Sequence, residues 1–556
     1  MEREAAATYN AASFKEIFEY DFTYIKGFMR NVRRFGNRPA LTCPLAEKTW
    51  TYAELNRECN KLARALLGDG VEKNEVVMYQ LFNSPEFVFI YLASQKIGAV
   101  NCPVNFKLAP GETAYIIDDS KPAVFFFDAE LAQSAFSALE MARHVPRRVV
   151  AVGKAPVEGA GREIVSYEQY VCGFDGEEPF ALRPVHIYDE TTRLYTSGTT
   201  GMPKGVPLNS INEVLSAHDV IMHFPLSPQD KTMNMSPWFH RGGLHSGGPT
   251  PTLYVGGEVV ILRQFHPRIC LELAEKYKVT FLIGAPTMLK LLSDLQERKP
   301  RDLSNLKGIV TMGAPLEREA CIRYHRVLTK NIFNGYGTTE TFWNTMLRPY
   351  DLPEMAGSAG RSCTDDEVRV VKRHAGRRAE PEELAAKDST EIGEVIIKTP
   401  AKSTYSYFNS PAESEKAFYK GWLYTGDLAT WDENGYITIV GRKDDMIISS
   451  GENIHPVQVE EILCQHPKVA DAFVVGVPDA TRGECVCAYV VCSEDGVSAR
   501  ELDEHCRLHP MLAKFKKPRY YRFVSELPYT ATGKKMRYRV REMAREDLRA
   551  GLLERV

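Results

Sequence analysis

Short apolar runs alternate with helical patterns along much of the chain, and this alternation constrains the fold more than any other feature. Thr51-x-x-Glu54 is a capping box, and helical spacing of the apolar residues behind it predicts a helix over 52–67. A second helix is predicted to begin at Ser84-Pro85 and to end at Gly98. The runs that predict strands are 75–81, 99–102, 123–127, 149–152, 258–262, 279–284 and 308–312. Such repeats predict an α/β fold, with parallel sheets covered by helices on both faces.

The length of 556 residues exceeds what one core supports, so several units are expected. The α/β pattern predicts two stacked subdomains joined by the loop at 194–208. From Val368 onward, short β-type runs and turn residues predict a small β-rich subdomain. A final unit is predicted from helices at 457–465 and 499–509 and strands at 472–477 and 486–491. We therefore predict a large N-terminal domain over 1–443 and a small α+β C-terminal domain over 444–556.

Composition argues against several classes of function. The net charge of −3 gives no reason to propose a nucleic-acid partner or an acidic membrane surface. No run of roughly 18 apolar residues occurs and the N-terminus is acidic, so neither a spanning helix nor a signal peptide is expected. The twelve cysteines form no CxxC pair, and Cys485 and Cys487 are expected to be buried free thiols on one face of a strand. A reducing cytoplasm fits this pattern best.

The stretch 194–208 has the sequence Leu-Tyr-Thr-Ser-Gly-Thr-Thr-Gly-Met-Pro-Lys-Gly-Val-Pro-Leu. Glycine lets the main chain approach a ligand closely, N–H groups and hydroxyls donate to phosphate oxygens, and Lys204 adds positive charge. The spacing differs from a Walker loop, because Pro203 and Gly205 replace the glycine and the Ser or Thr of that motif. We interpret the stretch as a phosphate loop, and a surface turn of small polar residues is the alternative.

This loop resembles the signature loop of the adenylate-forming superfamily, which includes acyl-CoA synthetases, luciferases and the adenylation domains of peptide synthetases. Six further stretches resemble superfamily motifs in the expected order, and together they span nearly the whole chain. The resemblance implies that the C-terminal domain is mobile. It also implies that the loop binds the phosphates of ATP through Thr196, Ser197, Gly198, Thr199, Thr200 and Lys204.

Ser236-Pro237-Trp238-Phe239-His240 resembles the segment that walls the acyl pocket of carboxylate-activating members. Core packing of an aromatic–histidine cluster is the alternative. The segment supplies no aspartate to pair an amino group, which disfavours an amino-acid substrate. Acetate-using relatives have a tryptophan where this chain has Gly337, so a larger acid is expected. The implied acyl-pocket residues are Trp238, Phe239, His240, Gly284, Gly313, Gly337 and Trp343.

Two motifs that follow predicted strands are Gly313-Ala314-Pro315 and Asn334-Gly335-Tyr336-Gly337-Thr338-Thr339-Glu340. Both are expected at the carboxyl ends of strands, where open α/β folds bind ligands. By resemblance, Gly313-Ala314-Pro315 lies behind the adenine and Tyr336 stacks on the adenine ring. The resemblance also implies that Thr339 donates to the α-phosphate and that Glu340 holds Mg²⁺. One carboxylate suits Mg²⁺, which otherwise keeps waters and phosphate oxygens as ligands. An ordinary strand-to-loop turn is the alternative for each motif.

Asp427, in Tyr424-Thr425-Gly426-Asp427, resembles the residue that accepts hydrogen bonds from the ribose hydroxyls. By the same resemblance, Arg442 is expected either to help hold the ribose or to contact the phosphates. For each of these two residues alone, a surface ion pair is the alternative interpretation.

Asp444 matches the superfamily hinge, about which the C-terminal domain rotates between two half-reactions. The loop after it borders the CoA tunnel in relatives, which implies Ser450, Gly451 and Glu452 as CoA-binding residues. Phe515 and Lys517 lie in a basic, aromatic run that could hold the CoA nucleotide or could be a solvated face.

Lys534 in Pro528-Tyr529-Thr530-Ala531-Thr532-Gly533-Lys534-Lys535 matches the lysine that enters the site for adenylation. Its ammonium could bridge the attacking carboxylate and the α-phosphate. A solvated lysine is the alternative. The residues to which the resemblance gives catalytic roles are Lys534, Thr196, Glu340 and His240.

These motifs predict an ATP-dependent carboxylate–CoA ligase that forms acyl-AMP and pyrophosphate, and then acyl-CoA and AMP. ATP, Mg²⁺ and CoA are the expected cofactor and co-substrates. An aromatic or alicyclic acid is the predicted substrate, with a short-to-medium-chain fatty acid as the alternative. An adenylate-only, luciferase-like enzyme and a non-catalytic nucleotide-binding relative are alternatives of other classes. The oligomeric state and the direction of the reaction stay open.

Overall fold

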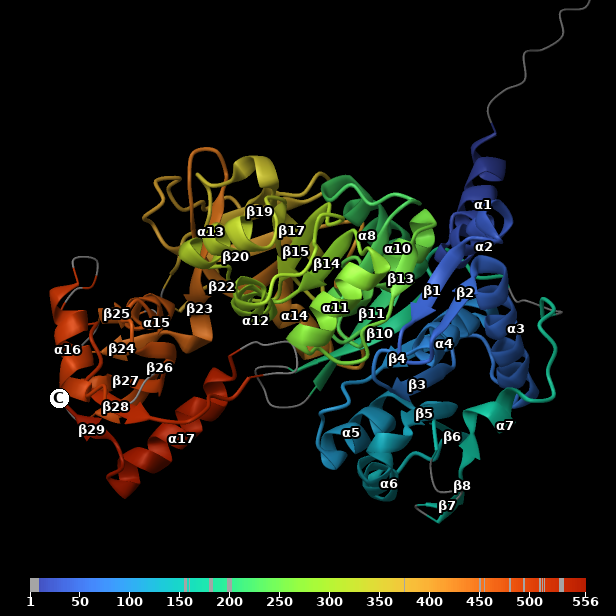
Figure 1. The fold of residues 1–556 in the computed structure, drawn as a ribbon, viewed down its shortest axis with the longest axis horizontal. Helices are drawn as coiled ribbons and strands as arrows, with labels where there is room; N and C mark the ends of the chain where they lie inside the picture. Colours follow the sequence, from blue (N-terminus) through green and yellow to red (C-terminus); the bar gives the residue numbers. More distant parts are fainter. Residues whose placement is uncertain are drawn as a thin grey trace, which may run out of the picture.

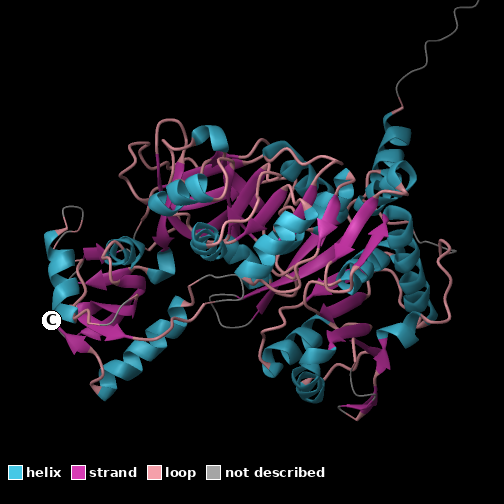
Figure 2. Ribbon diagram, in the orientation of Figure 1, coloured by secondary structure: helices cyan, strands magenta, loops and turns pink. Residues whose placement is uncertain are grey.

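The computed structural model describes residues 10–154, 158–159, 161–179, 184–197, 203–374, 376–449, 452–454, 456–479, 482–493, 496–509, 512, 514, 516–529 and 535–556. They form the predicted mixed α/β fold, with two large sheets, a small antiparallel sheet and a sheet near the C-terminus (Figure 1). Figure 2 shows helices around the large sheets and the C-terminal sheet at one end of the molecule.

The first sheet consists of β3 (Val76–Gln80), β4 (Val100–Pro103), β5 (Val124–Asp128), β6 (Arg148–Val152), β9 (Val165–Ser166), β10 (Glu190–Ser197) and β11 (Pro203–Asn209). Their order is β11-β10-β4-β3-β5-β6-β9, and all neighbours are parallel except β10 and β11. A short hairpin of β7 (Glu158–Gly159) and β8 (Arg162–Glu163) stands apart.

Helices cover both faces of this sheet because successive side chains of a strand point to opposite sides. In β5, Val124 and Phe126 join the core that includes α3 (Tyr52–Gly68), α4 (Pro85–Ile97) and α7 (Tyr167–Val171). Phe125 and Phe127 join the opposite core with α5 (Pro110–Ser120) and α6 (Ala132–Met141). A strand buried on both faces is therefore apolar throughout, as the run at 123–127 indicates.

The second sheet consists of β1 (Pro39–Cys43), β2 (Lys48–Thr51), β12 (Lys231–Asn234), β13 (Glu258–Val260), β14 (Phe281–Gly284), β15 (Gly308–Met312), β16 (Ile332–Thr338), β17 (Phe342–Leu347) and β18 (Arg361–Ser362). Its order is β18-β17-β16-β15-β14-β12-β13-β1-β2, with a parallel centre and antiparallel strands at both edges. Its helices are α8 (Ser210–His223), α9 (Arg241–His245), α10 (Pro249–Val255), α11 (Pro267–Tyr277), α12 (Pro286–Arg298) and α13 (Arg318–Val327).

The helix α4 connects the cores of the two sheets. Phe87 on α4 packs against Tyr79 of β3, with ring centroids 4.8 Å apart. Phe89, two residues on, packs against Trp50 of β2 in the second sheet at 5.6 Å. Almost every residue of α4 is buried, so this helix is apolar around its whole circumference rather than along one stripe.

The third sheet is antiparallel and contains β19 (Glu367–Val371), β20 (Gly393–Lys398), β21 (Phe418–Tyr419), β22 (Trp422–Trp431) and β23 (Ile437–Arg442), with α14 (Pro411–Ala417) beside it. The fourth contains β24 (Ile447–Ser449), β25 (Glu452–Ile454), β26 (Val469–Asp479), β27 (Gly483–Cys492), β28 (Tyr520–Phe523) and β29 (Glu554–Arg555). Its helices are α15 (Pro456–Cys464), α16 (Ala499–Leu508) and α17 (Arg537–Ala550). The predicted boundary at 443–444 falls on the turn Lys443–Asp445 between these two sheets, and stays a prediction.

Several local predictions are confirmed. The capping box at Thr51 and Glu54 is formed at the start of α3, and Gly98 ends α4 in a left-handed conformation. Cys485 and Cys487 are buried free thiols in β27. In the N-terminal segment, α1 (Ala11–Asp21) buries no side chain, whereas α2 (Tyr24–Phe35) packs into the core.

One prediction about connectivity is wrong. The loop at 194–208 does not join the two large sheets, because its ends lie in β10 and β11, neighbouring antiparallel strands of the first sheet. The chain passes to the second sheet through α8. Seven register pairs between β10 and β11 show the physical reason: the apolar residues on both sides of the loop form one hairpin.

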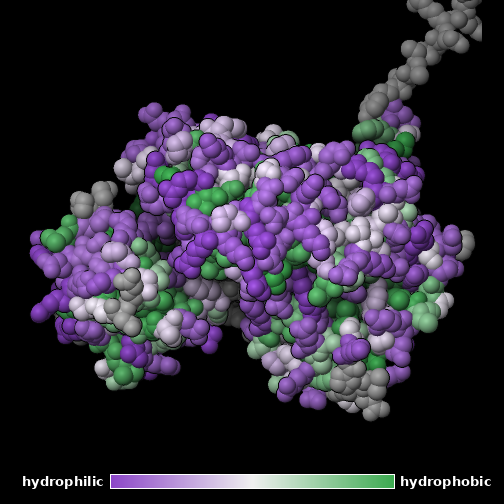
Figure 3. All heavy atoms as spheres, viewed as in Figure 1, coloured by the Kyte–Doolittle hydropathy of each residue, from purple (hydrophilic) through white to green (hydrophobic). Residues whose placement is uncertain are grey.

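Most of the molecular face seen in Figure 3 is hydrophilic, with hydrophobic residues in small groups. Within the described ranges, every helix is too short or too polar to serve as a membrane span.

His223, at the end of α8, is expected to make folding sensitive to mild acid. Nη2 of Arg348 approaches Nδ1 of His223 at 3.1 Å, and burial, reinforced by the charges of Arg348 and Lys402, lowers the pKa of His223 from 6.5 to about 4. Between these pH values the unfolded chain binds a proton that the folded chain excludes, so stability falls as the pH decreases.

Between pH 7 and pH 5 the wild type should therefore lose about 2 kcal/mol more of its free energy of unfolding than His223→Gln. Urea unfolding at both pH values measures this difference. Equal losses in the two proteins would contradict the assigned pKa.

Candidate active site

The predicted phosphate loop begins and ends in a regular hairpin. Ser197 at the end of β10 is the register partner of Pro203 at the start of β11, and Thr196 is the partner of Lys204. The backbones of Thr196 and Lys204 therefore lie side by side at the base of the loop. Three further residues predicted to bind phosphate lie outside the described part of the chain: Gly198, Thr199 and Thr200.

Lys204 lies beside a segment that we did not predict from the sequence. Its ammonium forms an ion pair with Glu413 of α14 and lies 5.4 Å from the ring centroid of Tyr407. The Tyr407 hydroxyl donates to Oε1 of Glu340 at 2.7 Å. Burial and the negative charge of Glu340 raise the pKa of Tyr407, so its hydroxyl keeps its proton and remains a donor. The segment 407–413 thus links the loop lysine to the carboxylate predicted to hold Mg²⁺.

The two glycine-containing motifs lie at the carboxyl ends of β15 and β16, which are neighbouring parallel strands. Gly313, Ala314 and Pro315 directly follow β15, and Met312 at its end is the register partner of Gly335 in β16. Gly313 has a φ of +87°, a conformation that glycine adopts without strain. The second motif differs from the expectation in one respect: residues 334–338 are the last part of β16 itself rather than a loop behind it.

Two residues of the second motif serve the fold. Asn334 is buried, and its Nδ2 donates to the carbonyl oxygen of Ser358 at 3.3 Å. A Cβ on Gly335 would lie 3.1 Å from Nε1 of Trp343, so the absence of a side chain allows this ring to pack. A role for Asn334 and Gly335 in nucleotide binding stays a prediction.

Tyr336, Asp427 and Arg442 form one cluster, although 91 residues separate the first two. The Tyr336 hydroxyl donates to Oδ2 of Asp427 at 2.7 Å, and Nη1 of Arg442 lies 3.1 Å from Oδ1 of the same carboxylate. Asp427 in β22 and Arg442 in β23 are register partners. Burial and the charge of Asp427 raise the pKa of Tyr336. The residues predicted to hold adenine and ribose are therefore brought together.

The turn after β16 carries the residues predicted to meet the α-phosphate and Mg²⁺. The hydroxyls of Thr338 and Thr341 are hydrogen bonded at 2.9 Å. The Thr339 carbonyl oxygen accepts from Nη1 of Arg241 at 2.6 Å. Glu340, partly exposed at the end of this turn, offers the single carboxylate that a Mg²⁺ ion bound to phosphate oxygens would need.

The predicted acyl segment divides between two environments. Phe239 meets Phe106 edge to face, with ring centroids 5.2 Å apart, and the ring of His240 lies 4.2 Å from that of Phe239. Phe82 lies 4.5 Å from Phe106, which extends the cluster. Trp238 is instead buried in the core against Phe87, at 5.6 Å. The structure therefore groups Phe239 and His240 with Phe82 and Phe106, but not with Trp238.

Of the other predicted acyl-pocket residues, Gly313 is exposed and the remaining three are tightly packed. A Cβ on Gly337 would lie 1.6 Å from the carbonyl oxygen of Phe342, so the backbone of β17 already fills this side of the glycine. Trp343 is buried in a core cluster and packs against Phe224 at 5.7 Å. A Cβ on Gly284 would meet the flexible side chain of Met235 at 2.6 Å. Their roles in an acyl pocket stay predictions.

The residues predicted to bind CoA are mostly not described. Ser450, Gly451 and Phe515 lie outside the described ranges, and the backbone of Glu452 begins β25. Lys517 forms an ion pair with Asp503 of α16, so its charge is already matched inside the C-terminal unit.

Asp444, the predicted hinge residue, lies in the short turn between β23 and β24. Its neighbour Asp445 lies 3.8 Å from Nη1 of Arg537 and 3.4 Å from Nη2 of Arg541, both on α17. Lys534 lies outside the described residues. Lys535, which follows it, donates to Oε2 of the buried Glu460 at 2.9 Å. Lys535 is thus tied to the core of the C-terminal unit.

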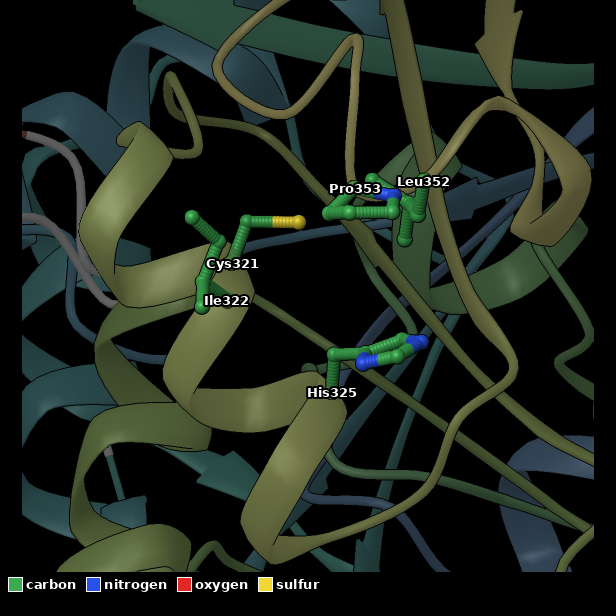
Figure 4. Close-up of a pocket in the computed structure, with 5 residues that line it drawn as sticks. All are labelled: Cys321, Ile322, His325, Leu352 and Pro353. Atoms are coloured by element: carbon green, nitrogen blue, oxygen red, sulfur yellow. The ribbon is translucent and has the colours of Figure 1, made fainter.

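Two surface hollows lie apart from these residues. Figure 4 shows the first, between α13 and the loop at Leu352–Pro353, which has no room for a water molecule. The second, of about 570 Å³, is open to solvent and is lined by Met222, His223, Pro225, Phe333, Arg348, Pro349 and Tyr350. Neither contains a residue that the motifs assign to the site.

Sequence reasoning missed Tyr407, Glu413, Phe82 and Phe106. The two phenylalanines carried a usable signal, because each follows the carboxyl end of a predicted parallel strand, where ligand sites form. Tyr407 and Glu413 carried none, since their partners Glu340 and Lys204 are 67 and 209 residues away.

Comparisons with known proteins show the family of this chain. The model described as AMP-binding enzyme matches residues 28–407, and that described as AMP-binding enzyme C-terminal domain matches residues 458–534. A feruloyl-CoA synthase of Amycolatopsis is 32% identical over 88% of this chain and 93% of its own. A medium-chain fatty-acid–CoA ligase of Escherichia coli is 30% identical over 89% and 86%. An anthranilate CoA ligase crystallised with anthranoyl-AMP aligns with a TM-score of 0.83 at 27% identity, over 95% of this chain and 98% of that one. The chain belongs to the AMP-binding enzyme family.

Proposed function

We propose that this enzyme is an AMP-forming carboxylate–CoA ligase that acts on an aromatic or alicyclic acid. The observation that carries the proposal is that Lys204 near the start of β11, Glu340 just after β16 and the Tyr336–Asp427–Arg442 cluster on β16, β22 and β23 converge. A cation, a carboxylate and a ribose-type acceptor in this arrangement match the parts of a magnesium–nucleotide. The feruloyl-CoA synthase and anthranilate CoA ligase relatives support the ligase class.

The proposed reaction has two steps in one site. A carboxylate oxygen of the acid attacks the α-phosphorus of ATP, the bond to the bridging oxygen breaks, and pyrophosphate leaves. The CoA sulfur then attacks the acyl carbon, its thiol proton is lost, and the acyl–oxygen bond breaks to release AMP. No side chain needs to form a covalent intermediate.

This chain's residues position the reactants and offset their charge. Asp427 and Tyr336 hold the nucleoside, and Lys204, with the donors of the hairpin, holds the terminal phosphates. Glu340 would hold Mg²⁺, which supplies further positive charge to the polyphosphate when bound. Lys534 is proposed to stabilise the pentavalent phosphorus of the first step.

The cluster of Phe82, Phe106, Phe239 and His240 supports a ring-containing acid. Aromatic side chains pack edge to face or offset against flat rings, which favours a compact cyclic substrate over a flexible chain. A short-to-medium-chain fatty acid remains the second candidate, because of the Escherichia coli relative.

The twelve free cysteines support a reducing, cytoplasmic location.

An acid panel tests the proposed function. Benzoate, cyclohexanecarboxylate and straight-chain acids are each supplied with ATP and Mg²⁺, and pyrophosphate release is measured with and without CoA. We expect cyclic acids to give the highest kcat/KM, and thioester to form only with CoA. Clear preference for C8–C12 straight chains would favour the fatty-acid candidate. Acyl-AMP without any thioester would favour an adenylate-only enzyme, and no pyrophosphate from any acid would reject both.

Lys534→Ala should abolish the first half-reaction and largely preserve the second. The ammonium is needed while negative charge moves onto pyrophosphate, whereas AMP leaves from the acyl carbon without it. We expect acyl-AMP formation to fall at least about 100-fold, while thioester formation from supplied acyl-AMP and CoA stays within about threefold of wild type. Lys535→Ala, which removes the neighbouring ammonium, is the matched comparison. Equal loss of both half-reactions in Lys534→Ala would refute the assigned role.

Glu413→Gln should strengthen ATP binding. The carboxylate of Glu413 pairs with Lys204, so phosphate oxygens must compete with it for the same ammonium. Removal of one partly exposed ion pair is expected to lower KM for ATP by about two- to fivefold with little change in kcat. Glu415→Gln, on the same helix, is the control, and an unchanged or raised KM for ATP in Glu413→Gln would contradict this competition.

A further inference from the structure

We propose that Arg241 and Lys402 are positioning residues that hold the turn between β16 and β17, and with it Thr339 and Glu340, in the geometry that magnesium–ATP requires. The inference rests on the proposed function, because the importance of this turn follows from its assigned roles in binding phosphate and Mg²⁺. Neither residue belongs to a motif identified in the sequence.

Arg241 binds the backbone at the first residue of the turn. It is the first residue of α9 and is 3% exposed. Its Nη1 donates to the carbonyl oxygen of Thr339 at 2.6 Å, and its Nη2 donates to the carbonyl oxygen of Lys402 at 2.8 Å and to Oγ of Ser216 at 3.2 Å. Burial lowers the pKa of Arg241 to about 10, so the guanidinium stays charged at neutral pH. All three acceptors are uncharged, so its directional bonds orient backbone rather than neutralise a carboxylate.

Lys402 binds the backbone just after the turn, at Trp343. Its buried Nζ donates to the carbonyl oxygen of Trp343 at 2.5 Å, to Oδ2 of Asp366 at 2.7 Å and to Oδ2 of Asp219 at 2.9 Å. Although burial opposes the charge, the two carboxylates raise the pKa of Lys402 above its usual value. Because Arg241 also binds the Lys402 carbonyl, the two cations form one unit that holds both ends of the segment 339–343.

A chain of side-chain hydrogen bonds continues from this unit into the turn. Asp366 accepts from Nδ2 of Asn344 at 3.1 Å, and Oδ1 of Asn344 accepts from the Thr341 hydroxyl at 2.6 Å. The Thr341 hydroxyl in turn lies 2.9 Å from that of Thr338. A connected network of this kind restrains every residue that it contains, and here it brackets Thr339 and Glu340.

The turn needs such support because its local conformation is unfavourable. Phe342 has a φ of +63°, in the left-handed region that a bulky side chain rarely adopts. Its carbonyl oxygen occupies the place where a side chain on Gly337 would lie. The guanidinium of Arg241 and the ammonium of Lys402 lie 5.4 and 5.9 Å from the Phe342 ring centroid. Strained backbone persists only where the surroundings over-determine it, and these cations supply that restraint.

Three residues near Lys402 could be interpreted as a metal site, because ligand atoms of Asp219, His223 and Cys363 lie within 4.8 Å of one another. Two positive charges already contact this group. Lys402 donates to Asp219 at 2.9 Å, and Nη2 of Arg348 lies 3.1 Å from Nδ1 of His223. A divalent cation would be repelled by both, so we assign Asp219 to Lys402 as its charge partner.

Arg241→Met is the main test, because it removes both carbonyl contacts without leaving a carboxylate that had been paired to it. We expect kcat for acyl-AMP formation to fall about 10- to 100-fold, as for displacements of about 1 Å at a reacting centre. The Mg²⁺ concentration for half-maximal rate should rise at least about threefold, because Glu340 is no longer held in place. Arg241→Lys keeps the charge but cannot reach both carbonyls, so it should lie between wild type and Arg241→Met.

Arg348→Met is the matched control. It removes a guanidinium that contacts His223 in the group of Asp219, His223 and Cys363. The interactions of this guanidinium do not involve the segment 339–343, so the Mg²⁺ dependence of wild type should be retained. A merely structural role would lower the melting temperature of Arg241→Met without moving its Mg²⁺ dependence. That outcome, or an equal shift in Arg348→Met, would overturn the inference.

Calorimetric titration of ATP with and without Mg²⁺ separates this inference from the proposed function. Wild type that binds ATP more tightly with Mg²⁺ yet forms no acyl-AMP from any acid would refute the proposed function alone. Arg241→Met with the wild-type gain in ATP affinity from Mg²⁺ would refute the positioning role alone. We expect this gain to shrink at least about threefold in Arg241→Met and to be unchanged in Arg348→Met.

Discussion

Parallel pairing of β15 with β16 is the constraint on which the candidate site depends. The register that places Met312 beside Gly335 brings the motif that follows β15 and the motif at the end of β16 to one edge of the sheet. Parallel strands need crossover helices, and the helices on both faces bury the strands while leaving their carboxyl ends open. The apolar strand sequences and the polar motifs that follow them are therefore two consequences of one architecture.

Charged groups of the site fall into two classes that differ in burial. Lys204 with Glu413 and Arg442 with Asp427 are partly exposed pairs, and a ligand can exchange one partner at modest energetic cost. Lys402 is almost fully buried between carboxylates, where loss of one partner would leave an uncompensated charge. The partly exposed pairs are suited to binding and the buried cations to holding backbone. Arg241 and Lys402 bind the backbone at the two ends of the turn after β16, whereas the partly exposed pairs lie beside Tyr407 and Tyr336.

Local signals in the sequence were reliable where the physics is local. The capping box at Thr51 and the glycine at Gly98 set the ends of helices through contacts within a few residues, and both are found as predicted. The route of the chain around the phosphate loop was not predictable in this way. Pairing of Thr196 with Lys204 depends on strand register, which short apolar runs do not distinguish from a crossover between sheets.

The sequence by itself determined the fold class, the family and the order of the motifs, because apolar periodicity and the spacing of glycines, hydroxyls and charges express local constraints on the backbone. Only the tertiary structure decided which side chains meet. It separated Trp238 from Phe239, joined Tyr407 to Glu340, and placed Arg241 against Thr339. Such contacts arise from the packing of distant elements, whose geometry depends on the whole chain rather than on neighbours in sequence.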